Sequence, residues 1–147
     1  MKKILVIGAG RSAVTLIKYL LDNAQENNWF VTVADFSVDL AKKAVENLEY
    51  AEAIFFDVTD EKKRKDEISD TDIVISMLPA ALHIIVAKDC MQFKTNLVTA
   101  SYVSEEIADL DEEAKTSGII LLNEIGLDPG IDHMSAMRVI DEIKDNG

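Results

Sequence analysis

Short apolar runs of strand length alternate along the chain with longer segments that carry apolar residues at helical spacing. The apolar runs predict strands at Lys3–Ile7, Phe30–Ala34, Ala53–Phe56, Ile73–Met77, Asn96–Thr99 and Ile119–Leu122. The segments between them predict helices at Arg11–Asn23, Val38–Asn47, Glu61–Ile68, Ala81–Phe93, Glu105–Ser117 and Ile131–Ile143. In the first helix, Val14, Ile17 and Leu21 are expected to share the face that packs on the core, because they are spaced by three and four residues.

The predicted strands are nearly continuous in apolar and β-branched residues, which is typical of strands covered by helices on both faces. A regular alternation of strands and helices indicates crossover connections between parallel strands. We therefore expect an α/β fold of Rossmann type, a doubly wound parallel sheet in three layers, with about six strands in the order 3-2-1-4-5-6. The length of 147 residues suits one such domain.

The charge of the chain excludes some partners. A formal net charge of −12 argues against nucleic acid and anionic membranes, because both require basic surfaces. The basic run Lys62–Lys65 is flanked by acidic residues, and we interpret it as a solvated helix face. The expected partner is a small molecule.

Cysteine usage and the apolar runs indicate the compartment. Cys90 is the only cysteine, so an internal disulfide is excluded, and we expect a buried, inert thiol in a reducing environment. No apolar run is long enough to span a membrane, and Met1 does not begin a signal-peptide pattern. We therefore expect a cytoplasmic protein.

The loop between the first strand and the first helix has the glycine pattern of a dinucleotide site. Gly8 permits a tight turn, Gly10 lets the backbone approach a pyrophosphate, and Ala13 allows close packing of helix on strand. Arg11 and Ser12 begin the helix, whose free N–H groups and dipole favour phosphates. Arg11 either touches phosphate or faces solvent. The alternative for the whole loop is a tight turn without a ligand.

Acidic residues at the ends of the next two strands indicate the adenosine half of the cofactor. Asp35 can accept hydrogen bonds from both ribose hydroxyls and would repel a 2′-phosphate. Neither Phe36 nor Ser37 supplies a compensating cation, so we predict NAD in preference to NADP. Asp57, followed by Val58, is placed to reach the adenine edge. Alternatively, Asp35 or Ser37 only caps the second helix, and Asp57 is an ordinary loop residue.

The loops after the fourth and fifth strands also reach the ligand edge of the sheet. The expected nicotinamide-side residues are Ser76, Met77, Leu78 and Pro79. His83, in the next helical turn, could donate to substrate or move a proton, although a lone histidine is more often structural. Tyr102, after the fifth strand, could bind a substrate carboxylate or pack as an amphipathic wall.

The loop after the sixth strand is dense in polar groups. Its amide, acidic and imidazole side chains are Asn123, Glu124, Asp128, Asp132 and His133. We interpret Asp128 as a helix N-cap and Pro129 as the first helical residue. The other groups suit a site that binds an amino group or handles protons. We predict no metal site.

Four segments, taken in order, resemble saccharopine dehydrogenase of the glutamate-forming, saccharopine reductase type. They are Gly8–Gly10, Ser76–Pro79 with His83, Val98–Ser104 and Leu122–Met134. The resemblance covers essentially the whole chain, and the last segment is its most specific part. Carried over by position, it implies that Tyr102 and Asp128 are substrate-side groups and that the glycine loop holds the pyrophosphate.

The resemblance implies an NAD(P)-dependent oxidoreductase of lysine and aminoadipate metabolism that acts on CH–NH groups. Such an enzyme transfers hydride between the cofactor and the imine bond of saccharopine, giving 2-aminoadipate 6-semialdehyde and glutamate. Members of this type often use NADP, whereas Asp35 favours NAD. Residues 1–147 are expected to be the NAD(P)-binding domain alone, inactive without a C-terminal substrate domain that could also form a homo-oligomer.

Three alternative functions remain open. Carboxyspermidine-type dehydrogenases share the architecture, and a free-standing NAD-sensing module would share the glycine loop. A methyltransferase-like fold that binds S-adenosylmethionine also has a glycine loop and a ribose-binding carboxylate. The sixth strand and its polar loop fit this last alternative less well than a dehydrogenase.

Overall fold

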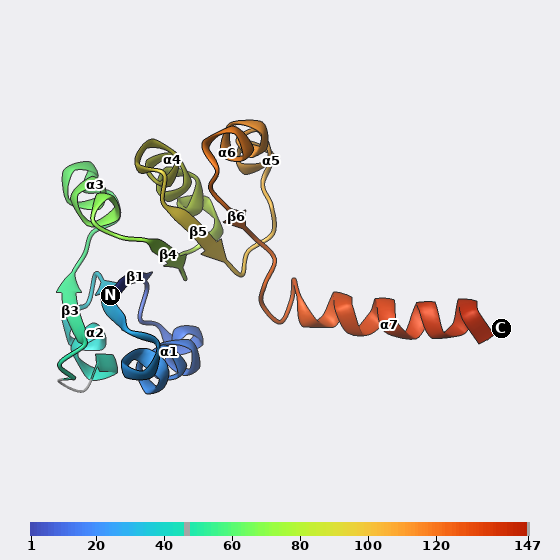
Figure 1. Cartoon of the computed structure of the whole chain (residues 1–147), viewed down its shortest axis with the longest axis horizontal. Helices are drawn as coiled ribbons and strands as arrows, with labels where there is room; N and C mark the ends of the chain where they lie inside the picture. The colour runs from blue at the N-terminus through green and yellow to red at the C-terminus, as the bar shows by residue number, and fades with distance from the viewer. Residues whose placement is uncertain (46–47, 147) are drawn as a thin grey trace.

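The computed structural model describes residues 1–45 and 48–146. Its parallel sheet has six strands in the order β3-β2-β1-β4-β5-β6, which confirms the predicted fold (Figure 1). The strands are β1 (Lys2–Ile7), β2 (Trp29–Asp35), β3 (Ala51–Phe55), β4 (Ile73–Ser76), β5 (Asn96–Thr99) and β6 (Leu121–Leu122). The last residue of β1, Ile7, pairs with Ala34 of β2 and with Ser76 of β4. The strand order reverses beside β1, where a ligand crevice is expected.

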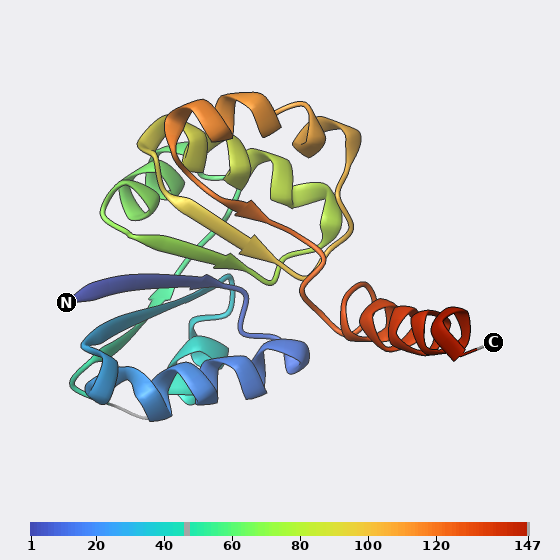
Figure 2. The same cartoon turned by 45° about the vertical axis from the view of Figure 1, so that its right-hand side comes forward.

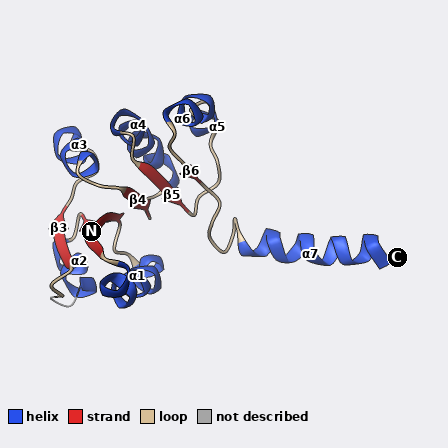
Figure 3. Ribbon diagram, viewed as in Figure 1, coloured by secondary structure: helices blue, strands red, loops and turns tan. Residues whose placement is uncertain are grey.

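Helices cover both faces of the sheet (Figures 2 and 3). The helices are η1 (Arg11–Ala13), α1 (Val14–Asn27), α2 (Val38–Val45), α3 (Glu61–Ser69), η2 (Ala80–Leu82), α4 (His83–Phe93), α5 (Glu105–Ala108), α6 (Asp111–Ser117) and α7 (Ile131–Asn146). Helices α1 and α2 lie on one face, and α3 to α6 lie on the other. The predicted helical residues Glu46 and Asn47 lie outside the described residues.

The central strand β1 divides the hydrophobic core in two, because successive side chains of a strand point to opposite faces. Ile4 and Val6 belong to the cluster that includes α1 and α2. Leu5 and Ile7 belong to the cluster that includes α3 and α4. All four side chains are buried. Burial on both faces explains the nearly continuous apolar pattern of this strand.

The first helical segment differs from its prediction at the start. Residues Arg11–Ala13 form a 3-10 turn before α1, and Val14 is exposed rather than buried. The buried face of α1 comprises Ile17, Leu20, Leu21 and Ala24. Val14, the first residue of α1, is not part of this buried face, so the prediction that it packs on the core is wrong.

The predicted helix Glu105–Ser117 is two helices, α5 and α6. The hydroxyl of Ser104 caps α5 by accepting from the Ile107 N–H. The Leu110 N–H then donates to the Ile107 carbonyl, three residues back, which tightens the backbone between the two helices. The helical spacing of apolar residues continues across this break, so the sequence pattern predicted one helix instead of two.

The interpretation of Lys62–Lys65 as a wholly solvated face is wrong for Arg64. Arg64 Nε donates to Asp89 Oδ2 of α4 at 2.5 Å, and both side chains are buried. Arg64 Nη1 also donates to the Val58 carbonyl. Arg64 precedes the buried Ile68 by four residues, so both side chains lie on the inward face of α3.

Helix α7 differs from the other long helices in its packing. None of its residues is buried, and Figure 1 shows it extending away from the sheet. Its exposed apolar residues include Ile131, Met134, Met137, Val139, Ile140 and Ile143. No helix among the described residues is both long and apolar enough to cross a membrane.

Candidate cofactor-binding and active site

The glycine loop has the geometry that its sequence predicts. Gly8 has φ +105°, a conformation that L side chains rarely adopt. A Cβ there would lie 3.1 Å from the Met77 carbonyl oxygen, so the loop after β1 passes directly beside the loop after β4. A Cβ at Gly10 would meet nothing within 4 Å, which leaves open space for an approaching ligand. Ala13 is fully buried, as close helix packing requires.

Asp35 joins the glycine loop to the end of β2. One carboxylate oxygen, Oδ2, accepts from the Ala9 N–H at 2.7 Å, and the other, Oδ1, accepts from the Ser37 N–H at 2.7 Å. Each oxygen keeps further acceptor capacity for a ribose hydroxyl. Both N–H groups that Asp35 accepts from lie outside α2, and the Leu40 and Ala41 N–H groups of α2 donate to the Ser37 carbonyl, so Asp35 is not the cap of that helix.

A cavity of about 200 Å³ opens beside this loop. Its lining includes the predicted cofactor residues Gly8, Asp35, Phe36, Asp57, Val58 and Leu78. Phe36 is exposed and lies 5.5 Å from the ring of Phe55, which gives the rim an aromatic wall. Arg11 and Ser12 are exposed at the start of η1, outside this lining.

The Asp57 carboxylate belongs to a local turn. Its Oδ1 accepts from the backbone N–H and the hydroxyl of Thr59, and these bonds lower the pKa of the Asp57 carboxyl. Asp57 therefore combines the role of an ordinary loop residue with a position in the cavity wall.

The structure places His83 below the rim rather than on it, where it is 2% exposed. Its Nδ1 lies 2.9 Å from Ser76 Oγ, and its Nε2 lies 2.8 Å from Ser101 Oγ and 3.1 Å from Thr99 Oγ1. Burial lowers the pKa of the imidazole, which favours the neutral form. This geometry favours the structural alternative, and a direct contact of His83 with substrate stays a prediction.

Tyr102 and Asp128, far apart in sequence, meet at the carboxyl edge of the sheet. The Tyr102 hydroxyl donates to Asp128 Oδ1 at 2.6 Å, and this bond raises the pKa of the phenol to about 12. Both side chains are exposed to solvent. The interpretation of Asp128 and Pro129 as N-cap and first helical residue is wrong, because α7 begins at Ile131 and Pro129 lies in the preceding turn.

The loop that carries Asp128 closes on itself. The Gly126 N–H donates to the Pro129 carbonyl, and the Ile131 N–H donates to the Gly126 carbonyl. Gly130 has φ +146°, and a Cβ there would lie 2.1 Å from the Gly126 oxygen. Only glycine fits at position 130, so the position of Asp128 depends on this residue.

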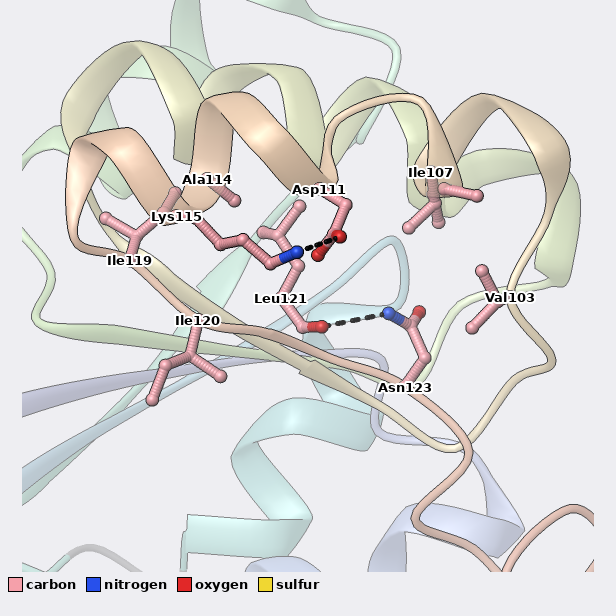
Figure 4. A pocket seen from close by; sticks show the side chains of 10 residues that line it. Val103, Ile107, Asp111, Ala114, Lys115, Ile119, Ile120, Leu121 and Asn123 are labelled. Carbon is pink, nitrogen blue, oxygen red and sulfur yellow. Dashed lines mark hydrogen bonds and ion pairs between the residues drawn. The ribbon is translucent and has the colours of Figure 1, made fainter.

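A larger cavity of about 430 Å³ lies beside β6 (Figure 4). Its apolar wall comes from α5, α6 and the chain around β6, and Lys115 and Asp111 form an ion pair at 2.6 Å. Asn123 Nδ2 donates to the Leu121 carbonyl at 3.2 Å. None of the predicted cofactor residues lines this cavity, so we do not assign the cofactor to it.

Asp128, Asp132 and His133 bring potential ligand atoms within 4.8 Å of one another. All three are exposed, and each is already hydrogen-bonded: Asp128 with Tyr102, and Asp132 with His133 at 2.8 Å. These contacts account for the cluster without an ion. The expectation that the chain has no metal site stays a prediction.

Sequence reasoning missed two sets of residues. Ser101 and Thr99 hold the imidazole of His83, and Arg64 and Asp89 form the buried ion pair. A signal for the pair was present, because Asp89 lies between the buried Ala87 and Cys90 of α4 and a buried carboxylate needs a partner. Cys90 itself is buried with its thiol pKa raised to about 12, which confirms the inert thiol.

Known proteins similar to this chain point to one family. Residues 4–122 match the saccharopine dehydrogenase NADP binding domain. An alpha-aminoadipic semialdehyde synthase of Arabidopsis thaliana is 45% identical over 121 residues, which are 82% of this chain and 11% of that protein. The saccharopine dehydrogenase (NADP(+), L-glutamate-forming) of Saccharomyces cerevisiae is 39% identical over 142 residues, 97% of this chain and 31% of that protein.

Solved structures agree with these sequence matches. Apo saccharopine dehydrogenase (L-Glu forming) from Saccharomyces cerevisiae gives a TM-score of 0.85 at 37% identity, covering 99% of this chain and 32% of that one. Homoserine dehydrogenase of S. aureus, at 14% identity and a TM-score of 0.60 over 84% of this chain and 32% of that one, shares the fold alone. The chain spans about a third or less of the length of these relatives. The chain belongs to the saccharopine dehydrogenase family, in which it corresponds to the NADP-binding domain.

Proposed function

We propose that this chain is the cofactor-binding part of an oxidoreductase that interconverts saccharopine with 2-aminoadipate 6-semialdehyde and glutamate. The observation that carries the proposal is that the cofactor cavity and the Tyr102–Asp128 pair lie at the same carboxyl edge of one parallel sheet. The family and its saccharopine-acting relatives support the substrate class. The substrate-binding domain would follow in the longer protein, as the relatives' lengths suggest, and would provide any contact between subunits.

The residues of the chain fit a dinucleotide. Gly8 and Gly10 bring the backbone of the loop close to a pyrophosphate, and Asp35 offers its remaining lone pairs to the ribose. Phe36, Asp57 and Val58 line the cavity for the adenine. When bound, the nicotinamide exchanges hydride with the substrate carbon of the C–N bond. The chain binds and orients the cofactor against that carbon.

Tyr102 and Asp128 are proposed to handle a proton at the substrate nitrogen. The carboxylate of Asp128 accepts the phenol hydrogen and so holds the Tyr102 hydroxyl in a fixed direction. A protonated phenol can donate a hydrogen bond to substrate only when it turns away from Asp128, so substrate has to compete with that contact. The pair is exposed, and the substrate domain of the longer protein is proposed to cover it.

The proposal is tested by joining this chain to the C-terminal region of the yeast relative and following saccharopine-dependent reduction of NAD or NADP. Turnover is expected with one of the two cofactors. The Tyr102→Phe form of the same protein is the matched control and should lose most of the rate while it keeps cofactor affinity. A folded fusion that binds NADPH but shows no turnover with either cofactor would favour a nucleotide-sensing module instead.

Cofactor preference depends on Asp35. Asp35→Asn keeps the side-chain shape and removes the charge, so the affinity for NADPH relative to NADH should rise by about tenfold. Asp35→Ala should also lower the affinity for NADH, because it removes the ribose acceptors and the bond to Ala9. Calorimetric titration of each variant with NADH and NADPH gives both affinities.

Asp57→Asn is the matched control, because it neutralises a second carboxylate of the same cavity and should leave the NADPH-to-NADH ratio unchanged. If Asp35→Asn left the ratio of NADPH to NADH affinity unchanged, the carboxylate of Asp35 would only hold the glycine loop and would not select the cofactor. The predicted preference for NAD would then have no basis, in keeping with the NADP in the name of the yeast relative.

A further inference from the structure

Buried below the rim, the imidazole of His83 contacts the carboxyl ends of two neighbouring strands, β4 and β5. We propose that His83 is a positioning residue for the Tyr102–Asp128 pair: it holds the Ser101 hydroxyl and thereby fixes the backbone that presents Tyr102. The importance of the pair in the reaction rests on the proposed function. The positioning itself does not, and it is measurable without cofactor or substrate.

The contacts of His83 connect β4, α4 and β5. Nδ1 meets Ser76 Oγ, at the end of β4, at 2.9 Å. Nε2 lies 2.8 Å from the Oγ of Ser101, just beyond β5, and 3.1 Å from the Oγ1 of Thr99, within β5. The Ser101 N–H donates to Thr99 Oγ1 at 3.3 Å. Ser101 is therefore held through both its hydroxyl and its N–H.

A second set of bonds leads from Ser101 to the loop after β6. The Ser101 carbonyl accepts from the Glu124 N–H at 3.1 Å, and Glu124 Oε1 accepts from the Val103 N–H at 3.1 Å. Tyr102 lies between these two bonded residues, and its hydroxyl reaches Asp128 at 2.6 Å. The ends of β4, β5 and β6 are thus joined through one imidazole and one serine.

The surroundings of His83 favour a neutral ring, which can hold its neighbours in position without taking up a proton. Burial lowers the pKa of the imidazole, and its hydrogen-bond partners are the hydroxyls of Ser76, Ser101 and Thr99. A neutral imidazole has one donor and one acceptor nitrogen, and a hydroxyl can satisfy either. His83 acts through Ser101 and does not itself reach the rim.

The variants His83→Gln and His83→Asn test the contacts of the two ring nitrogens separately. In Gln, the terminal amide lies near the position of Nε2 and can keep the Ser101 contact; in Asn, the amide lies near Nδ1 and can keep only the Ser76 contact. We therefore expect His83→Gln to preserve the Tyr102–Asp128 bond and His83→Asn to lose it. Both variants retain a buried polar group with a partner, which protects the fold.

The readout is the ionisation of Tyr102, followed by NMR of ¹³C-tyrosine-labelled protein, with Tyr102→Phe assigning its resonance. The groups around the phenol are Asp128, Asp132, Glu124 and His133. With its pKa raised to about 12, the phenol stays protonated in the parent chain. Loss of the bond to Asp128, the largest cause of the raised pKa, moves the pKa of Tyr102 toward the ordinary tyrosine value of about 10, so a measurable part of the phenol ionises at pH 10.5.

The expected result is a protonated phenol in His83→Gln and an ionised one in His83→Asn. A protonated phenol in both variants, equal ionisation in both, or ionisation in His83→Gln alone would each overturn the proposal. Serine variants give a second measurement that disturbs the core less. Ser101→Ala should ionise Tyr102 at pH 10.5, whereas Ser76→Ala should not, and the opposite pattern or no difference would also overturn it.

Discussion

Replacing Arg64 with methionine is expected to lower the free energy of unfolding by about 3–5 kcal/mol, because it leaves the Asp89 carboxylate buried and unpaired. Arg64 Nε and Asp89 Oδ2 are 2.5 Å apart, and both side chains are less than a tenth exposed. A domain of this size has a total stability of roughly 5–15 kcal/mol, so the loss would be a large fraction of it. Urea unfolding followed by circular dichroism measures the change.

Two controls separate the buried charge from the loss of packing. The double variant Arg64→Met with Asp89→Leu removes both charges and should recover most of the stability, since apolar replacement of a buried pair is often neutral. Lys115→Met removes an exposed partner of Asp111 and should cost no more than about 1 kcal/mol. A loss below 1 kcal/mol in Arg64→Met alone would contradict the burial of the pair.

Gly8→Ala is expected to lower cofactor affinity at least tenfold and to destabilise the fold by about 1–3 kcal/mol. The backbone at φ +105° is strained for alanine, and the new Cβ would lie 3.1 Å from the Met77 oxygen. Relief of that contact separates the loop after β1 from the loop after β4, and both are proposed to face the cofactor. Calorimetry with NADPH and urea unfolding measure the two effects.

Two other glycines provide matched controls for Gly8. Gly118 also has a positive φ, +72°, but it ends α6 away from the cofactor cavity, so Gly118→Ala should cost stability and leave affinity unchanged. Gly10→Ala meets no neighbouring atom and should lower affinity without loss of stability. Parent-like binding of NADPH by Gly8→Ala would exclude this loop as the pyrophosphate site.

The sequence predicted the sheet better than it predicted the helices around it. Two local sequence patterns predicted the strand order. They are the alternation of strands and helices, which indicates parallel crossovers, and the glycine loop after the first strand. The break between α5 and α6 occurs where the Leu110 N–H donates to the Ile107 carbonyl, three residues back. The spacing of apolar residues along the sequence does not reveal this bond.

The candidate site was predicted residue by residue but not as a set of contacts. Tyr102 and Asp128 were both expected at the substrate side, yet their bond depends on a closed loop in which Gly130 fits at φ +146°. The assignment of Asp128 as an N-cap failed for the same reason. His83 looked solitary because its partners, Ser76, Thr99 and Ser101, come from two other segments of the chain.

The bonds of Asp35 bear on how fast a cofactor can be exchanged. Its carboxylate joins the Ala9 and Ser37 N–H groups, so the protein's own bonds hold the glycine loop, which loses little conformational freedom when a dinucleotide arrives. Association then needs no slow ordering step before the pyrophosphate is held. Binding of a dinucleotide to this chain is therefore expected to be fast, because the loop that receives the pyrophosphate is already in place.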